Sequence, residues 1–171
     1  MLWDNVLAFL YHIISCIVSA DEDHDQKLSG EEKLKLVLKC LVGIKELFPR
    51  IAGQCFPSTH SLIELIDSLV AVFNKWKALI VDLHPHDPSL PVISFKDLFR
   101  FFTTIANIVT GIELMNPNLP GEEKLLLATE MVRNFLPVFP ILADVVGDNT
   151  EVLVGFVNDV VDLLNICLKK G

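Results

Sequence analysis

Apolar residues recur along the chain three and four positions apart, in long runs that short polar or proline-rich segments separate. Residues at this spacing share one face of an α-helix, so the pattern predicts an all-α protein. The clearest run covers residues 59–81. Its apolar stripe consists of Leu62, Ile66, Leu69, Phe73 and Trp76. A second run over residues 150–169 repeats this stripe with Leu153, Val157, Val160 and Leu164.

The periodicity predicts helices in two sets of three. The first set covers about residues 3–20, 30–48 and 59–81, and the second covers about residues 95–112, 121–135 and 150–169. Proline residues supply the predicted stops, because Pro49 follows the second helix and Pro137 and Pro140 follow its counterpart. Ser94 is the predicted N-cap of the helix that begins the second set.

One segment occurs twice. Residues 28–36 read Leu-Ser-Gly-Glu-Glu-Lys-Leu-Lys-Leu, and 91 positions later residues 119–127 read Leu-Pro-Gly-Glu-Glu-Lys-Leu-Leu-Leu. The same ungapped offset aligns Phe48-Pro49 with Phe139-Pro140, Thr59 with Thr150, Val70 with Val161 and Asn74 with Asn165. We interpret the offset as a tandem duplication. It predicts three-helix units at 1–82 and 92–171, joined by a Pro-rich linker at 83–91 and packed as one pseudo-twofold bundle. Convergent helical patterning is the alternative.

Between the first two predicted helices, residues 21–32 read Asp-Glu-Asp-His-Asp-Gln-Lys-Leu-Ser-Gly-Glu-Glu. This segment resembles the calcium-binding loop of the EF-hand family, in a helix–loop–helix context. The resemblance implies that the loop wraps one Ca²⁺ with six to eight oxygen ligands. The implied ligands are the carboxylates of Asp21, Asp23 and Asp25, the backbone carbonyl of Lys27, Ser29, which in this family often acts through a water, and the carboxylate of Glu32.

The loop departs from the family pattern at Gln26, where EF-hand loops carry glycine because the backbone turns there through positive φ. A non-glycine residue costs about 1 kcal/mol in that conformation, so we expect weaker calcium binding. The alternative is a capping box, in which Ser29 and Glu32 satisfy the first N–H groups of the following helix. It accounts for these two residues but not for the alternate spacing of the preceding aspartates.

The duplicated loop at residues 112–123 lacks this chemistry, because Ile112 and Leu114 replace ligands and Pro120 replaces Ser29. EF-hand loops pair through their eighth residues. We therefore expect Leu28 and Leu119 to meet in a short contact about a pseudo-twofold axis.

Charge and composition narrow the function. The net charge of −8 disfavours nucleic acids and anionic lipids. The first 20 residues lack the basic start of a signal peptide, and charged residues interrupt the apolar runs. We expect a soluble chain with no transmembrane span. Peripheral membrane contact through the first helix is disfavoured by its scarcity of Lys and Arg.

No catalytic pairing or phosphate loop is recognisable, so we expect no enzymatic activity. The expected function is that of a calcium-binding structural or interaction protein, in which one ion clamps the first two helices and the partner is a protein or a larger assembly. One alternative is a calcium switch that exposes an apolar groove, which the low Met content of 3 disfavours. The other is a metal-free helical scaffold.

Overall fold

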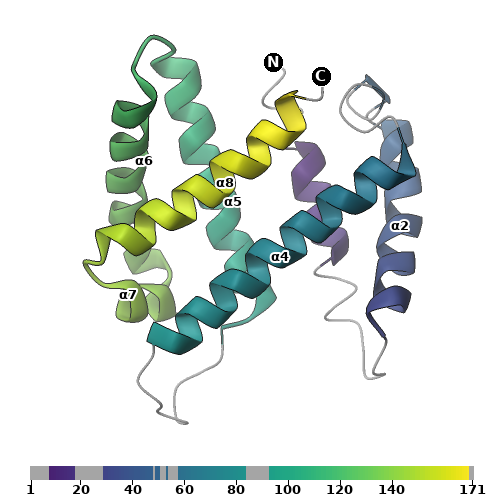
Figure 1. The fold of residues 1–171 in the computed structure, drawn as a ribbon, viewed down its shortest axis with the longest axis horizontal. Coiled ribbons are helices and arrows are strands. Elements are labelled where there is room, and N and C mark those ends of the chain that lie inside the picture. Colours follow the sequence, from purple (N-terminus) through teal and green to yellow (C-terminus); the bar gives the residue numbers. More distant parts are fainter. Residues whose placement is uncertain are drawn as a thin grey trace. The chain divides into compact units, whose positions relative to one another are not determined.

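The structure, a computed structural model, describes residues 8–17, 29–47, 49–50, 53, 58–83 and 93–169. Within these residues every regular element is a helix, which confirms the predicted all-α class (Figure 1). The elements are the apolar helix Ala8–Ile17, α2 (Gly30–Leu47), α4 (Thr59–Leu83), α5 (Phe95–Met115), α6 (Gly121–Phe135), the 3₁₀-helix η1 (Leu136–Val138), α7 (Pro140–Val146) and α8 (Thr150–Lys169).

The helix starts follow the sequence prediction closely. The five predicted helices that begin within the described residues start where the apolar periodicity and the caps place them. Ser94 caps α5, because its hydroxyl accepts a 3.2 Å hydrogen bond from the backbone N–H of Asp97. The helix Ala8–Ile17 lies within the predicted helix 3–20, whose remaining residues are outside the described part. Of the predicted linker, only Leu83 is described, and it is the last residue of α4.

Backbone contacts divide the chain into two compact units. The first unit is Met1–Leu69 with Ile166–Gly171, and the second is Val70–Asn165. In the first unit the helix Ala8–Ile17 buries one face, as does the beginning of α4. The buried apolar side chains there are Phe9, Leu10, Ile13, Ile14, Ile17, Val37, Leu62, Leu65, Ile66 and Leu69. The predicted apolar stripes of 59–81 and 150–169 are buried at every position.

The second unit has an aromatic core centred on Trp76, which is fully buried. The Trp76 ring meets Phe156 of α8 at a centroid distance of 4.9 Å and Phe101 of α5 at 5.9 Å, both with edge-on geometry. Such arrangements place the positive edge of one ring against the negative face of the other. The indole N–H of Trp76 donates to Asp159 of α8 at 2.9 Å, so the polar atom of this buried ring is satisfied.

The helices α5 and α6 lie side by side in the second unit and are joined by a short turn at residues 116–120 (Figure 1). The side chain of Lys124 stabilises this turn. The ammonium of Lys124 contacts the Glu113 carboxylate at 2.8 Å and the carbonyl of Pro117 at 3.2 Å. It therefore ties the last turn of α5 to the first turn of α6.

Two short helices, η1 and α7, were not predicted. The helix α6 ends at Phe135, as expected from Pro137. Pro140 was predicted to stop a helix, but it is instead the first residue of α7. Proline suits that position because its missing N–H would have no partner there. The helix α7 ends at Val146, and its C-cap is Gly147, whose φ of 51° lies in the left-handed region that favours glycine.

One helix among the described residues passes a length-and-hydropathy test for membrane spans, namely Lys96–Met115 in α5. Its mean hydropathy is 1.3, and 44% of the window is buried inside the protein. Its aromatic and aliphatic residues supply the core of the second unit, including Leu98, Phe101, Phe102 and Ile105. The core helix of a globular unit passes the same test, so this is weak evidence and no span is assigned.

Candidate calcium loop

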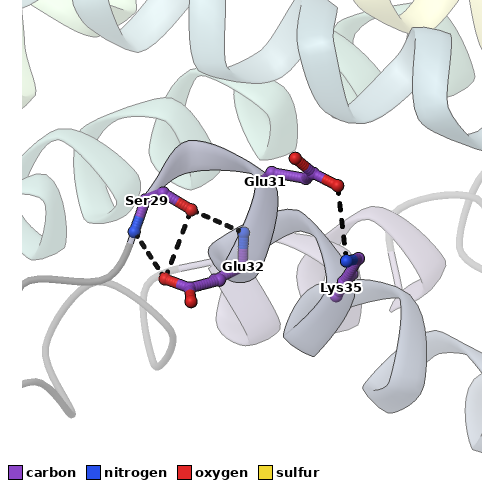
Figure 2. Close-up of polar contacts among 4 residues, drawn as sticks. All are labelled: Ser29, Glu31, Glu32 and Lys35. Atoms are coloured by element: carbon purple, nitrogen blue, oxygen red, sulfur yellow. Dashed lines mark hydrogen bonds and ion pairs between the residues drawn. The ribbon is translucent and has the colours of Figure 1, made fainter.

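The candidate loop ends where α2 begins, and the structure describes its last four residues. The carbonyl of Ser29 accepts the first helical hydrogen bond, from the N–H of Lys33 at 3.0 Å, which makes Ser29 the N-cap. The Ser29 hydroxyl accepts from the N–H of Glu32 at 3.3 Å, while the N–H of Ser29 donates to Oε2 of Glu32 at 2.8 Å (Figure 2). The two residues form the reciprocal capping box that the sequence offered as the alternative to calcium.

This geometry bears on whether Glu32 fits a calcium ion. In an EF-hand the twelfth residue presents both carboxylate oxygens to the metal. Here Oε2 of Glu32 also accepts from the Ser29 hydroxyl at 3.2 Å, so it has two donors from the cap. Glu32 is exposed on the first turn of the helix that leaves the loop, which is the position of a twelfth ligand. Bidentate ligation of a metal ion by Glu32 would require its carboxylate to turn away from the cap.

A neighbouring carboxylate has a different partner. Glu31 lies beside Glu32 and contacts Lys35 at 3.3 Å, one turn along α2 (Figure 2). Both side chains of this pair are more than two-thirds exposed, so the pair contributes little to stability. Because Glu31 takes no part in the cap and is no predicted ligand, it serves as an internal control for Glu32.

The predicted ligands Asp21, Asp23, Asp25 and Lys27 lie outside the described residues. Among the residues that are described, no group of three or more His, Cys, Asp or Glu side chains could hold a metal ion. The described elements on either side of the loop are the helix Ala8–Ile17 and α2, which agrees with a helix–loop–helix context.

The segment at residues 112–123, the predicted counterpart of the candidate loop, is described in full. The helix α5 continues to Met115, so its last turn includes Ile112 and Leu114, the counterparts of Asp21 and Asp23. Ile112 is buried, and the N–H of Asn116 bonds back to its carbonyl at 2.9 Å. Pro120 is the N-cap of α6 and makes no side-chain cap bond. The predicted contact between Leu28 and Leu119 stays a prediction, because Leu28 lies outside the described residues.

Sequence reasoning missed a polar contact in the second unit that involves the buried ring of Trp76. Asp159 accepts from the indole of Trp76 and also from the ammonium of Lys75, at 2.9 Å. The residues are more than 80 positions apart, and no local motif links them. An aspartate in the middle of a predicted apolar helix was the one available signal.

Comparison of the chain with protein-family models, with curated proteins and with solved structures gives no match. The likeness to EF-hand loops therefore rests on residues 21–32 and their flanking helices.

Proposed function

We propose that the protein is a non-enzymatic calcium-binding interaction protein, in which one Ca²⁺ bound by residues 21–32 clamps the helix Ala8–Ile17 to α2. The observation that carries the proposal is the alternate spacing of Asp21, Asp23 and Asp25, followed by Glu32 at the start of a helix. Carboxylates this close repel one another unless a cation neutralises them. A capping box alone needs only Ser29 and Glu32.

A structural ion is favoured over a cooperative sensor. The duplicated loop lacks the ligands, so only one ion is expected, and Gln26 weakens its binding. An ion that binds only the folded state stabilises that state by mass action. We therefore expect calcium to raise the thermal stability of the first unit without a cooperative transition.

The tandem duplication is part of this proposal. The helices α2 and α6 begin 91 residues apart, at Gly30 and Gly121, and α4 and α8 begin at the same separation, at Thr59 and Thr150. The matching starts support one ancestral unit whose second copy replaced the metal ligands with apolar residues. The pseudo-twofold pairing of the two loops is likewise proposed.

The test is a calorimetric calcium titration of the metal-free protein and three variants. Glu32→Gln retains the cap, because glutamine serves as well as glutamate at this position of a capping box. It removes the carboxylate charge that calcium requires. Asp21→Asn removes the first ligand charge, and Glu31→Gln is the matched control. We expect one saturable site that Glu32→Gln and Asp21→Asn abolish and that Glu31→Gln retains.

Two results would contradict the proposal. Absence of binding at millimolar calcium would reduce residues 21–32 to an acidic helix cap. Equal binding by the wild type and Glu32→Gln would place the ion elsewhere. The first result would leave a metal-free helical scaffold whose function lies in what it binds, and the second would leave a calcium-binding protein whose site lies outside Glu32.

A further inference from the structure

Exposed apolar side chains follow one another along α6 and η1. Leu127 is 38% exposed, Phe135 is 45% exposed and Val138 is 69% exposed, while Met131 between them is half-buried. Successive members of this set are four, four and three positions apart, so they lie along one side of α6 and its continuation. We call these four residues the α6 stripe. A run of exposed apolar side chains on one side of a helix is typical of an interaction surface.

The stripe is not needed to hold α6 in its own unit. The helix already buries another face, formed by Ala128, Thr129 and Val132. A surface helix of a globular protein needs one apolar face for packing. The stripe is a second apolar face, left without a cover by the described residues around it.

The charged residues beside the stripe indicate which kind of partner could bind there. Glu123 and Glu130 are exposed and lie one turn before and about one turn after Leu127. The two cations of α6 already contact carboxylates, since Lys124 lies 2.8 Å from Glu113 and Arg133 lies 2.8 Å from Glu130. Arg133 neutralises Glu130, so the acidic part of the border is Glu123, beside the N-terminal end of the stripe.

The net charge of −8 favours a cationic partner over an anionic one. A second copy of the chain brings the same acidic surface and is repelled, as is an anionic lipid surface. A cationic helix with one apolar face would meet both features, because its Lys and Arg side chains would neutralise the border while its apolar side chains cover the stripe.

We propose that the α6 stripe docks a basic amphipathic helix of a partner protein. The partner's apolar face covers Leu127, Met131, Phe135 and Val138, and its cationic border faces Glu123. This inference rests on the interaction role in the proposed function, but not on the calcium loop, which lies in the other compact unit.

The probe is a fluorescent 18-residue peptide of Leu and Lys in amphipathic helical order, titrated with the full chain and read by anisotropy. A scrambled peptide of the same composition is the peptide control. The stripe variant is Phe135→Gln with Val138→Gln. Its control is Val81→Gln on α4, because the exposed fraction of Val81, 52%, lies between those of Phe135 and Val138. The charge variant is Glu123→Lys, and its control is Asp82→Lys at the exposed end of α4.

We expect the Kd for the amphipathic peptide to rise roughly tenfold in the stripe variant and severalfold in Glu123→Lys, with little change in either control. Circular dichroism checks that each variant is folded. If the stripe variant does not fold, the affinity of Glu123→Lys still tests the proposal. Equal affinity across all variants, equal binding of the scrambled peptide, self-association of the chain through the stripe, or no binding would each overturn the proposal. The peptide titrations are run both with calcium and with a chelator, so that failure of the proposed docking surface is distinguished from failure of the proposed calcium loop.

Discussion

Asp159 provides the sharpest test of the core of the second unit. Its side chain is 17% exposed and accepts from two donors of different kinds. The buried indole of Trp76 donates at 2.9 Å, and the ammonium of Lys75, which is 63% exposed, donates at 2.9 Å. Substitutions of Asp159 and Lys75 separate the two contributions.

The magnitudes follow from burial. Asp159→Ala leaves a fully buried indole N–H without an acceptor, which costs about 1–3 kcal/mol. It also removes an ion pair whose cation is largely in water, worth about 0–1 kcal/mol. Asp159→Asn keeps an oxygen that accepts from Trp76 and loses only the ion pair, as does Lys75→Met. The expected order of destabilisation is Asp159→Ala well above Asp159→Asn and Lys75→Met, which are nearly equal.

Urea unfolding monitored by circular dichroism measures the three free energies, and coincident fluorescence transitions check two-state behaviour. High salt should shrink the cost of Lys75→Met, because exposed charges are screened. The excess cost of Asp159→Ala over Asp159→Asn should persist in salt. If Asp159→Ala costs no more than Lys75→Met, the indole bond contributes nothing and the account of this core is wrong.

Three further predictions concern local backbone. Gly147→Ala should lower the free energy of unfolding by about 1–3 kcal/mol, because φ is 51° and ψ is −128° while the space around a Cβ is open; urea unfolding measures it, and no change would refute the strain. Ser29→Ala should cost about 1 kcal/mol in chelator by removing the cap, whereas Pro120→Ser should gain a similar amount by creating a capping box with Glu123; equal melting temperatures would contradict both. Gln26→Gly should tighten calcium binding roughly fivefold in calorimetry if the loop turns through positive φ there.

The sequence predicted helices well because their signals are local. Gly30 and Gly121 follow N-cap positions, and apolar periodicity runs unbroken from Thr59 and from Thr150. The sequence did not predict α7, because a proline such as Pro140 is expected both after the end of one helix and in the first turn of the next. The α5 end was placed three residues early, at Ile112 rather than Met115, because the duplication suggested that a loop begins there.

Local contacts at the end of the candidate loop were predictable from the sequence, whereas long-range contacts were not. The capping box of Ser29 and Glu32 depends on residues three positions apart, so a short motif specifies it. Long-range contacts such as Trp76 with Asp159 depend on how helices pack, and no spacing rule encodes them. The apolar residues of the α6 stripe can be read from the sequence, but their exposure is known only from the structure, in which α6 buries a different face.

The turn at residues 116–120 holds the end of α5 to the start of α6, which is the role proposed for calcium between the helix Ala8–Ile17 and α2. The Lys124 ammonium is held by the Glu113 carboxylate and the Pro117 carbonyl, so a cation bound by oxygens closes the turn. Lys124 is 19% exposed and Glu113 is 40% exposed. Lys124→Met keeps the packing of the stem but loses these bonds, and should cost about 1–2 kcal/mol. Urea unfolding should give the same loss with calcium and with chelator, whereas the stability lost in Glu32→Gln should appear only with calcium. A calcium-dependent effect of Lys124→Met would refute the independence of the two clamps.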